Sequence, residues 1–347
     1  MKLFFGFVCA FLQVSHQNPT NQWTLMPHVL VVVQDGTLDQ QPLSCLEQPG
    51  EDNKDEDISW RRNGEVESQR GNVYMLELME SLAGGNYTCH SKNGSLLNHT
   101  EVLIQDDETT KRRILVKTGQ GDHLDCAAQN YNGEFHCSWT WHSRRVGKVA
   151  FLKARRVSHG DDTQCTGDES GQHWTCTSAQ SNFGCSVDDS GHRISCLDQQ
   201  HCPYAEESLQ IYVTVYVKTE HFLVESYSKY FYLSEIVKPD KVAITQHPVN
   251  ITTIEWSYPS SWSRPYSYFP LTFQIAQFRG RCKRCADQCT DSKPNKTAIV
   301  HSTCQFQVKP RAKAVCIRAK DVLCNSQWSD WSFVRLRRHK KNKHQQN

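Results

Sequence analysis

The chain has 347 residues, with 39 Lys and Arg against 37 Asp and Glu, and 16 cysteines. This length exceeds one β-sandwich of about 100 residues and suits two or three domains. The near-balance of charge argues against a general polyanion binder, and the cysteine content argues against a cytosolic protein with reduced thiols.

Residues 1–21 predict a secretory signal peptide. Lys2 precedes an apolar run of about a dozen residues, whereas a membrane span needs roughly 20. A buried core segment is the alternative. Later segments are too short or too polar to span a bilayer, so we expect a secreted, extracellular protein. Sequons for N-glycosylation agree with this location and occur at Asn86, Asn93, Asn98, Asn250 and Asn295.

Residues 22–105 predict an immunoglobulin-like sandwich. Cys45 and Cys89 are expected to join the two sheets, with Trp60 packed on the disulfide and Tyr87 forming the tyrosine corner. Chance spacing in another all-β fold is the alternative interpretation. Further apolar positions of this domain are predicted at Val73, Met75 and Leu82.

Residues 106–237 predict a second sandwich. Cys126 and Cys137 flank an Asn-Gly turn, which predicts a hairpin that a disulfide can join. Residues 209–217 alternate apolar and polar side chains, as a half-buried strand does. Residues 157–202 are polar and rich in cysteine, which predicts loops held by disulfides rather than by a core.

Residues 238–334 predict a third sandwich, and residues 335–347 form a basic tail. Strands are expected around Ile254 and Trp256, at residues 271–275 and at residues 315–319. The tail makes heparan sulfate a candidate partner, with a solvated tail as the alternative. A metal cluster and disulfides are both possible interpretations of the closely spaced Cys282, Cys285 and Cys289, and an oxidising compartment favours disulfides.

One cysteine is expected to stay unmatched within the chain. If Cys9 leaves with the signal peptide, two cysteines fall in the first domain, seven in the second and six in the third. The odd thiol then belongs to the seven. Cys202 is our candidate, because it lies in a polar stretch and a proline follows it; another of the seven is the alternative.

Residues 328–332 repeat a Trp-Ser pair around one intervening residue. The two indoles are three positions apart, and a polyproline-like turn would place them on one side. Cationic side chains could then stack on the indoles. We expect a structural ladder built from Trp328, Ser329, Trp331, Ser332, Arg318 and Lys320.

This box resembles the signature of class I cytokine receptors, whose ligand-binding units are fibronectin type III sandwiches. The order of domains, an immunoglobulin-like domain followed by two such sandwiches, resembles that of the interleukin-12 beta-subunit family. The family's chain is shared by interleukin-12 and interleukin-23. The matching segments are residues 87–90, 130–133, 202–209, 236–240, 267–269, 271–273 and 318–321.

The resemblance implies a soluble receptor-like chain that forms a disulfide with a four-helix cytokine alpha subunit. The family's interchain cysteine corresponds to Cys202. The resemblance also implies a pocket between the two fibronectin-like domains, where Tyr131, Tyr268 and Asp321 would receive an arginine from the partner. The heterodimer would activate receptors on the surface of lymphocytes.

The chain departs from this family in several places, one of which is a third domain with six cysteines where the family has fewer. After Asp321 the family has aromatic residues, whereas this chain has residues 322–324, Val-Leu-Cys. Cys165 and Cys185 are additional, and we expect them to form their own disulfide around a Cys176–Cys196 pair.

Catalytic motifs are not evident in the sequence, and we expect neither an enzyme nor a bound cofactor or metal. The main functional hypothesis is a disulfide-linked cytokine subunit. The alternatives are a soluble decoy receptor or antagonistic homodimer, and a matrix or adhesion protein tethered by its basic tail.

Overall fold

The computed structural model describes residues 22–34, 40–47, 57–77, 83–106, 113–119, 121–157, 162–201, 209–245, 253–279, 296–301, 303–324 and 326–336. The predicted signal peptide, Cys202, Asn250, Asn295, the cysteines at 282, 285 and 289, and residues 337–347 lie outside these ranges.

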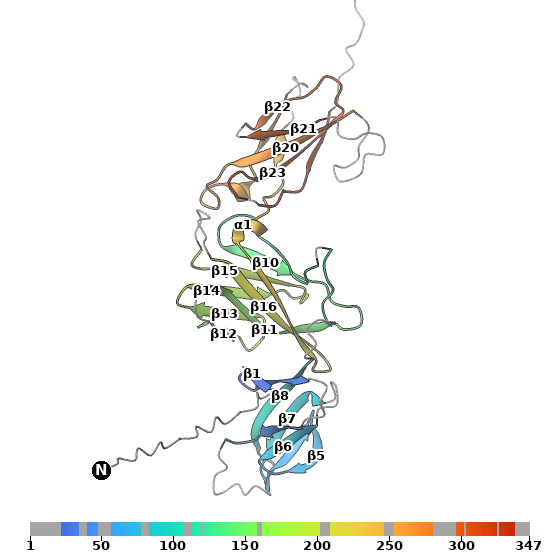
Figure 1. Cartoon of the computed structure of the whole chain (residues 1–347), viewed down its shortest axis with the longest axis vertical. Coiled ribbons are helices and arrows are strands. Elements are labelled where there is room, and N and C mark those ends of the chain that lie inside the picture. Colours follow the sequence, from blue (N-terminus) through green and yellow to red (C-terminus); the bar gives the residue numbers. More distant parts are fainter. Residues whose placement is uncertain are drawn as a thin grey trace, which may run out of the picture. The chain divides into compact units, whose positions relative to one another are not determined.

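The chain forms two compact units. The first comprises Met1–Lys111 with Glu220–Val224, and the second comprises Arg112–Thr219 with Glu225–Asn347. Almost all regular structure in both units is β-strand (Figure 1), which confirms the predicted all-β fold of tandem sandwiches. The second unit holds two pairs of sheets, which we call the middle and the third sandwich.

The first unit contains a six-stranded and a two-stranded sheet. The larger sheet has the order β1-β2-β8-β7-β4-β5, and β3 pairs with β6 in the smaller one. Their bounds are β1 Gln22–Met26, β2 Val29–Gln34, β3 Gln40–Ser44, β4 Ser59–Arg62, β5 Glu65–Arg70, β6 Val73–Glu77, β7 Gly85–His90 and β8 Leu96–Asp106.

The core of the first unit is built around the Cys45–Cys89 disulfide. Trp60 is buried in the same cluster, and the Tyr87 hydroxyl donates a hydrogen bond of 2.8 Å to the carbonyl of Ala83, as a tyrosine corner requires.

The inward positions of β6 differ from those predicted. Tyr74 and Leu76 are buried, whereas Val73 is exposed and Met75 half-buried. The Tyr74 ring lies 5.5 Å from Trp60 and 5.3 Å from Tyr87, so an aromatic side chain fills this face and shifts the inward set by one residue.

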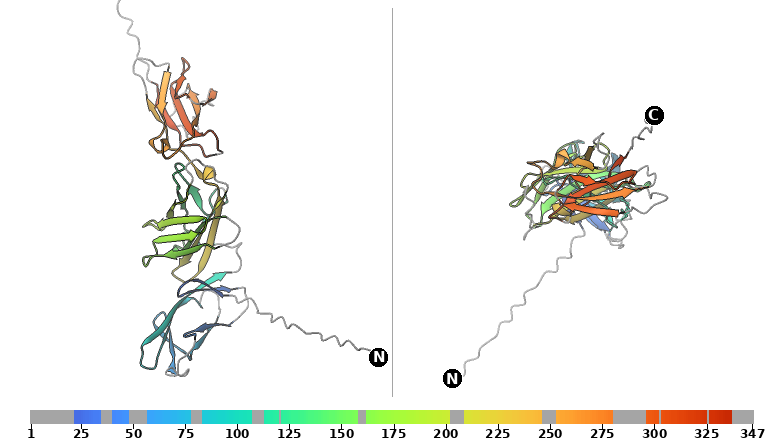
Figure 2. Two further views of the ribbon diagram at one scale, coloured as in Figure 1. Left: turned by 90° about the vertical axis from the view of Figure 1, so that its left-hand side faces the viewer. Right: turned by 90° about the horizontal axis from the view of Figure 1, so that it is seen from above.

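The middle sandwich packs a six-stranded sheet, β12-β13-β14-β15-β10-β9, against a three-stranded sheet, β11-β16-β17. Figure 2 shows the two layers from a second side. Their bounds are β9 Asp125–Ala127, β10 Glu134–Ser138, β11 Gly147–Arg156, β12 Gln164–Gly167, β13 His173–Ser178, β14 Ser181–Val187, β15 Arg193–Asp198, β16 Ile211–Thr219 and β17 Val224–Phe231.

The cysteine-rich stretch forms strands with a core, not the predicted loops. Four strands, β12 to β15, run through it, and they bury Trp174, Phe183 and Ile194. The disulfides join Cys165 to Cys176 and Cys185 to Cys196. The expected pairs, Cys165 with Cys185 and Cys176 with Cys196, are therefore wrong.

The reason for this pairing is a repeat that spans residues 165–176 and 185–196. Both segments have the pattern Cys-x2-Asp-x-Ser-Gly-x4-Cys, and each disulfide joins directly opposed residues of one hairpin. Each turn uses a glycine with positive φ, Gly171 at 68° and Gly191 at 66°. The Cys126–Cys137 disulfide has the same sequence separation of 11 residues.

The aspartate of each repeat organises its turn. In the first repeat, Asp168 accepts hydrogen bonds from the Ser170 hydroxyl at 2.7 Å and from the backbone of His173 at 3.1 Å. These bonds lower the pKa of Asp168 below its usual range. In the second repeat, Asp188 accepts the corresponding bonds from Ser190 and from the backbone of Arg193.

The third sandwich consists of the sheets β18-β19-β22 and β21-β20-β23-β24. Helix α1 precedes it, and the 3-10 helix η4 lies within it. The bounds are α1 Leu233–Ile236, β18 Ala243–Thr245, β19 Thr253–Ser257, η4 Ser260–Trp262, β20 Leu271–Phe278, β21 Lys296–His301, β22 Gln305–Gln307, β23 Ala314–Asp321 and β24 Ser332–Arg335.

The cysteines of the third sandwich differ in state. Cys316 is buried and takes part in a disulfide, whereas Cys304 and Cys324 carry free thiols and are half-buried.

Candidate functional site

The second unit contains the junction between the middle and third sandwiches, which we call the elbow. The linker, residues 236–238, is hydrogen-bonded on both sides. Ala128 of the middle sandwich bonds to Ile236 and Lys238, and Gln327 of the third sandwich bonds to Val237. The linker backbone is therefore tied to both sandwiches, which positions the side chains around it.

Tyr131 enters the third sandwich from the hairpin that joins β9 to β10. Its side chain is fully buried, and its ring meets Trp262 and Phe269 edge-on at 5.8 and 5.9 Å. Its backbone N–H donates to the carbonyl of Tyr266 at 3.2 Å. The Tyr131 hydroxyl donates to an Asp321 oxygen at 2.8 Å, so the tyrosine connects the two sandwiches.

The Asp321 carboxylate is occupied by its own chain. One oxygen accepts the Tyr131 hydroxyl, and the other accepts the backbone N–H groups of Leu323 at 2.7 Å and Cys324 at 3.4 Å. Asp321 has no exposed surface. Burial, and then the charge of Asp321, raise the pKa of Tyr131 above its ordinary value, so the phenol stays protonated and remains a donor.

In this chain the two residues bind each other, and the Leu323 N–H bonds to the buried Asp321 carboxylate. Tyr131 and Asp321 thus connect the two sandwiches. The backbone N–H groups of Leu323 and Cys324 cover this side of the carboxylate.

Tyr268 is half-buried and lies beside the exposed Arg264; we call the surface formed by Arg264, Tyr266, Tyr268 and Leu323 the outer elbow. The Arg264 guanidinium lies 5.6 Å from the centre of the Tyr268 ring, and Arg264 is exposed. Two further large side chains are exposed here, Tyr266 with 44% and Leu323 with 67% of its surface accessible. Arg264 was not among the predicted site residues, although the proline and two tyrosines at residues 263–268 were a signal for an exposed aromatic turn.

The Trp-Ser box forms a ladder with the two predicted cations. Arg318 lies between the indoles, with its guanidinium carbon 4.8 Å from Trp328 and 4.5 Å from Trp331, and Lys320 lies 5.4 Å from Trp328. The Arg318 Nε–H donates to Gln274 at 2.6 Å. Each element of the ladder is thus bound within the third sandwich.

The two serines of the box bind backbone groups. The Ser329 hydroxyl accepts a bond from the Ala319 N–H at 2.9 Å, and the Ser332 hydroxyl donates to the Val242 carbonyl at 2.6 Å. These bonds fix the box against β23 and against the chain that precedes β18, which agrees with a structural role.

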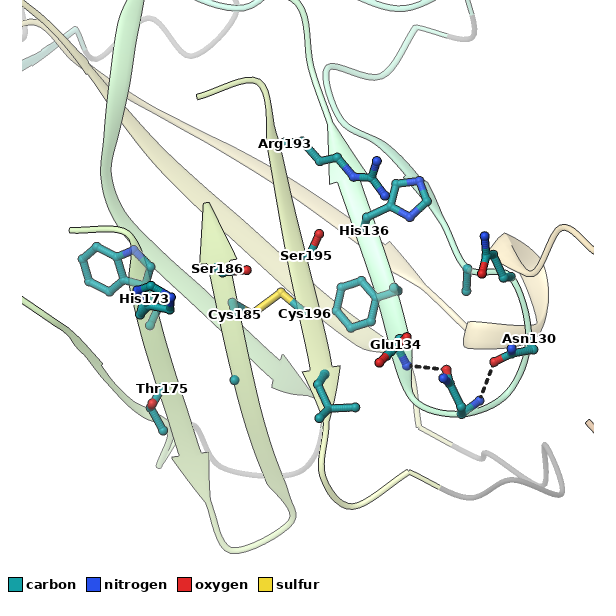
Figure 3. A pocket seen from close by; sticks show the side chains of 17 residues that line it. Asn130, Glu134, His136, His173, Thr175, Cys185, Ser186, Arg193, Ser195 and Cys196 are labelled. Carbon is teal, nitrogen blue, oxygen red and sulfur yellow. Dashed lines mark hydrogen bonds between the residues drawn. A yellow bond between two sulfur atoms is a disulfide. The ribbon is translucent and has the colours of Figure 1, made fainter. Parts of the chain in front are cut away.

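The middle sandwich also carries a hollow of about 590 Å³ on the outer face of its larger sheet. His136, Ser195, Ser186 and His173 form one row across four neighbouring strands (Figure 3). Burial, and then the Arg193 charge, lower the pKa of His136, which keeps its imidazole neutral at physiological pH. In the described part of the chain, no three His, Cys, Asp or Glu side chains are placed to hold a metal ion.

Comparison with known proteins identifies the family. Residues 121–219 match the family model described as cytokine interleukin-12p40 C-terminus. The chain is 30% identical over 332 residues to interleukin-12 subunit beta of Homo sapiens, covering 90% of this chain and 92% of that protein. It is 29% identical to the same subunit of Lama glama, with the same coverage, and 29% identical to that of Felis catus, covering 81% and 83%.

The chain belongs to the interleukin-12 subunit beta family. Members of this family are cytokine subunits, so the chain is a cytokine subunit and not an enzyme. The family assignment agrees with the predicted resemblance and with the cytokine-receptor-like sandwiches. Within the described ranges, the helices are all too short or too polar to cross a membrane.

Proposed function

We propose that this chain is secreted and pairs through Cys202 with a four-helix cytokine alpha subunit. The resulting heterodimer acts on cytokine receptors at the surface of lymphocytes. The elbow provides the non-covalent part of the contact, with Tyr131 and Asp321 holding its shape from inside and Tyr268 on its outer side.

The pairing of the middle-sandwich cysteines carries this proposal. Six of the seven cysteines predicted for this domain are joined in three hairpin disulfides, 126–137, 165–176 and 185–196. The remaining one is Cys202. An unmatched cysteine in an oxidising compartment is available for a disulfide with a second chain.

The backbone that leads to Cys202 is fixed close to the Tyr131 hairpin. Asp198 donates its N–H to the Gly133 carbonyl at 3.0 Å, and its side chain pairs with Arg156 at 2.6 Å in a buried position. Gly133 has a φ of +85°, and a Cβ atom there would lie 2.7 Å from the Asp198 carbonyl oxygen and 2.6 Å from the His201 ring. The chain therefore reaches His201 beside the hairpin that supplies the elbow with Tyr131.

Secretion is supported by independent features. Four disulfides lie within the described residues of the first unit and middle sandwich, as expected for an extracellular protein. Two of the predicted glycosylation sites, Asn86 and Asn93, have exposed side chains. The N-terminal apolar segment provides the export signal.

Co-expression tests the covalent pairing. The chain is expressed in secreting animal cells with each four-helix cytokine subunit of the same organism, one at a time, and the medium is analysed by non-reducing electrophoresis. We expect one subunit to appear in a reducible heterodimer. The change Cys202→Ser should abolish this band and leave secretion intact, whereas the matched change Cys304→Ser should preserve it.

Three outcomes would contradict the proposal. A heterodimer that survives Cys202→Ser removes that cysteine from the interchain disulfide. A reducible species of twice the chain's mass, formed without any helical subunit, favours the antagonistic homodimer. A chain secreted only as a monomer with every subunit tested favours a decoy receptor.

Heparan sulfate binding by the basic tail stays a prediction. The tail's charge would be screened by salt, so retention on heparin should fall as ionic strength rises. Arg335 belongs to β24 and Leu336 is buried, so the tail to be removed begins at residue 337. A chain ending at Leu336 should elute earlier than the full chain, and equal retention of the two would contradict a role for the tail.

A further inference from the structure

The outer elbow has the composition of a protein-binding hot spot. Interfaces are enriched in tyrosine and arginine, and their strongest contacts cluster in small groups of such residues. Here Arg264, Tyr266 and Leu323 are all exposed. Tyr266 accepts the Tyr131 backbone N–H, and Leu323 donates to Asp321, so the exposed residues are held by the two ends of one buried tyrosine–aspartate connection.

The charged groups at this surface have different surroundings. The Asp321 carboxylate accepts three hydrogen bonds from its own chain. The Arg264 guanidinium lies over the ring of Tyr268. A cation that approached Arg264 itself would be repelled, whereas an anion would be attracted.

Arg264 is oriented but not neutralised. A guanidinium that stacks on an aromatic ring keeps its N–H edge available for two parallel hydrogen bonds to a carboxylate. Among the ion pairs of the described residues, none involves Arg264. Asp240, a carboxylate bonded to this turn, accepts a bond of 2.8 Å from the Ser261 hydroxyl.

We propose that Arg264, stacked on Tyr268, binds an acidic side chain of the helical partner at the outer elbow. This inference rests on the proposed function and specifies the chemistry of its contact. The partner of this chain should therefore present an aspartate or glutamate to Arg264, bordered by apolar groups that cover Tyr266 and Leu323.

The test measures non-covalent affinity in chains that carry Cys202→Ser. The probe is the four-helix subunit captured in the co-expression experiment, purified and titrated at physiological salt. Arg264→Glu should weaken binding about tenfold or more, because it removes the charge-assisted bonds and adds repulsion. Arg264→Lys keeps the charge and loses the planar fork, and should cause a smaller loss, about threefold.

Arg279→Glu is the matched control. Arg279 is also exposed, lies in the same sandwich and directly follows β20, whereas the first residue of β20, Leu271, pairs with Asp321 at the elbow. The strand places the two ends about 25 Å apart. Arg279→Glu applies the same change of charge away from the elbow and should leave affinity unchanged. The thermal unfolding of all three variants should match that of the parent.

Each result decides the matter. Unchanged or stronger binding by Arg264→Glu overturns the proposal. Equal weakening by Arg264→Glu and Arg279→Glu shows a general effect of charge and also overturns it. If no helical subunit is captured by the unmodified chain, the proposed function fails and this inference fails with it.

Discussion

Two arginines of the third sandwich stack on aromatic rings, and their surroundings differ. Arg318 lies between two indoles and donates its Nε–H to Gln274, so both faces and one edge of its guanidinium are used within the domain. Arg264 covers a single ring from an exposed position. The same cation–π chemistry therefore stabilises the fold in one case and leaves a group available for a partner in the other.

The same distinction separates the inner from the outer elbow. Tyr131 and Asp321 have no exposed surface and bind one another, whereas Tyr266 and Leu323 are exposed. Engaged groups should affect stability, and exposed groups should affect binding. The following predictions test this division.

The largest effect is expected at Tyr131. The change Tyr131→Ala removes a fully buried ring that contacts Trp262 and Phe269, and should lower the free energy of unfolding by about 4 kcal/mol. Tyr131→Phe keeps the ring and removes the donor to Asp321, and should cost about 2 kcal/mol. Urea unfolding measures both. A loss below about 1 kcal/mol for Tyr131→Ala would show that the elbow does not depend on this connection.

The second-largest loss of stability is expected at Arg318, and Arg264 provides the comparison. Arg318→Ala removes two ring contacts and the bond to Gln274, and should lower the free energy of unfolding by about 2 kcal/mol. Arg264→Ala removes one exposed contact and should cost less than about 0.5 kcal/mol. Chemical unfolding of both variants under the same conditions checks this. Similar losses would remove the distinction between an engaged and an available arginine.

Two asparagines of the first unit allow the same comparison between a side chain that is bound within the fold and one that is exposed. The Asn98 side chain donates to the Cys45 carbonyl at 2.8 Å, whereas Asn93 is exposed. In chains produced without glycans, Asn98→Asp should cost about 1 kcal/mol because this donor is lost, and Asn93→Asp should stay within about 0.5 kcal/mol of the parent. Equal unfolding midpoints for the two variants would contradict the assignment of Asn98 as an engaged group.

The smallest effect concerns pH and the Lys238–Asp330 pair beside the ladder. The hydrogen bond from Lys238 lowers the pKa of Asp330 from 3.8. A carboxyl with a lowered pKa in the folded state adds stability above its unfolded value and loses that stability as the pH falls through its folded value.

Both side chains of this pair are more than one-third exposed, so the gain at neutral pH should be only about 0.3 kcal/mol. Asp330→Asn should show this deficit at pH 7, and the deficit should vanish as the pH falls below 3.8. Unfolding curves at several pH values measure it. A deficit that persists at low pH would have a cause other than the ion pair.

Some features were accessible from the sequence because their signals are local. The spacing of Cys45, Trp60 and Cys89 predicted the first core, and the Trp-Ser box predicted the ladder with Arg318. The pairing of Cys165 and Cys185 with their true partners was also accessible, because both repeats have an Asp-x-Ser-Gly turn between cysteines 11 apart. The repeat, and not the nesting of one cysteine pair around another, is the signal that determines the pairing.

Other features depend on tertiary placement and have no local signal. The closure of Asp321 arises from a hairpin that lies 190 residues earlier in the chain and from the backbone that follows the aspartate. The shift of buried positions in β6 arises because Tyr74 fills the space between Trp60 and Tyr87. Neither the exposure of Arg264 nor its stacking on Tyr268 follows from their separation of four residues.

The proposed heterodimer requires that Cys202 be available for a second chain. Peptide mapping of the secreted complex without reduction identifies the peptide that is disulfide-linked to the segment containing Cys202. We expect a peptide from a four-helix cytokine subunit, with the pairs 126–137, 165–176 and 185–196 found within the chain. A disulfide between Cys202 and another cysteine of this chain would contradict the proposal.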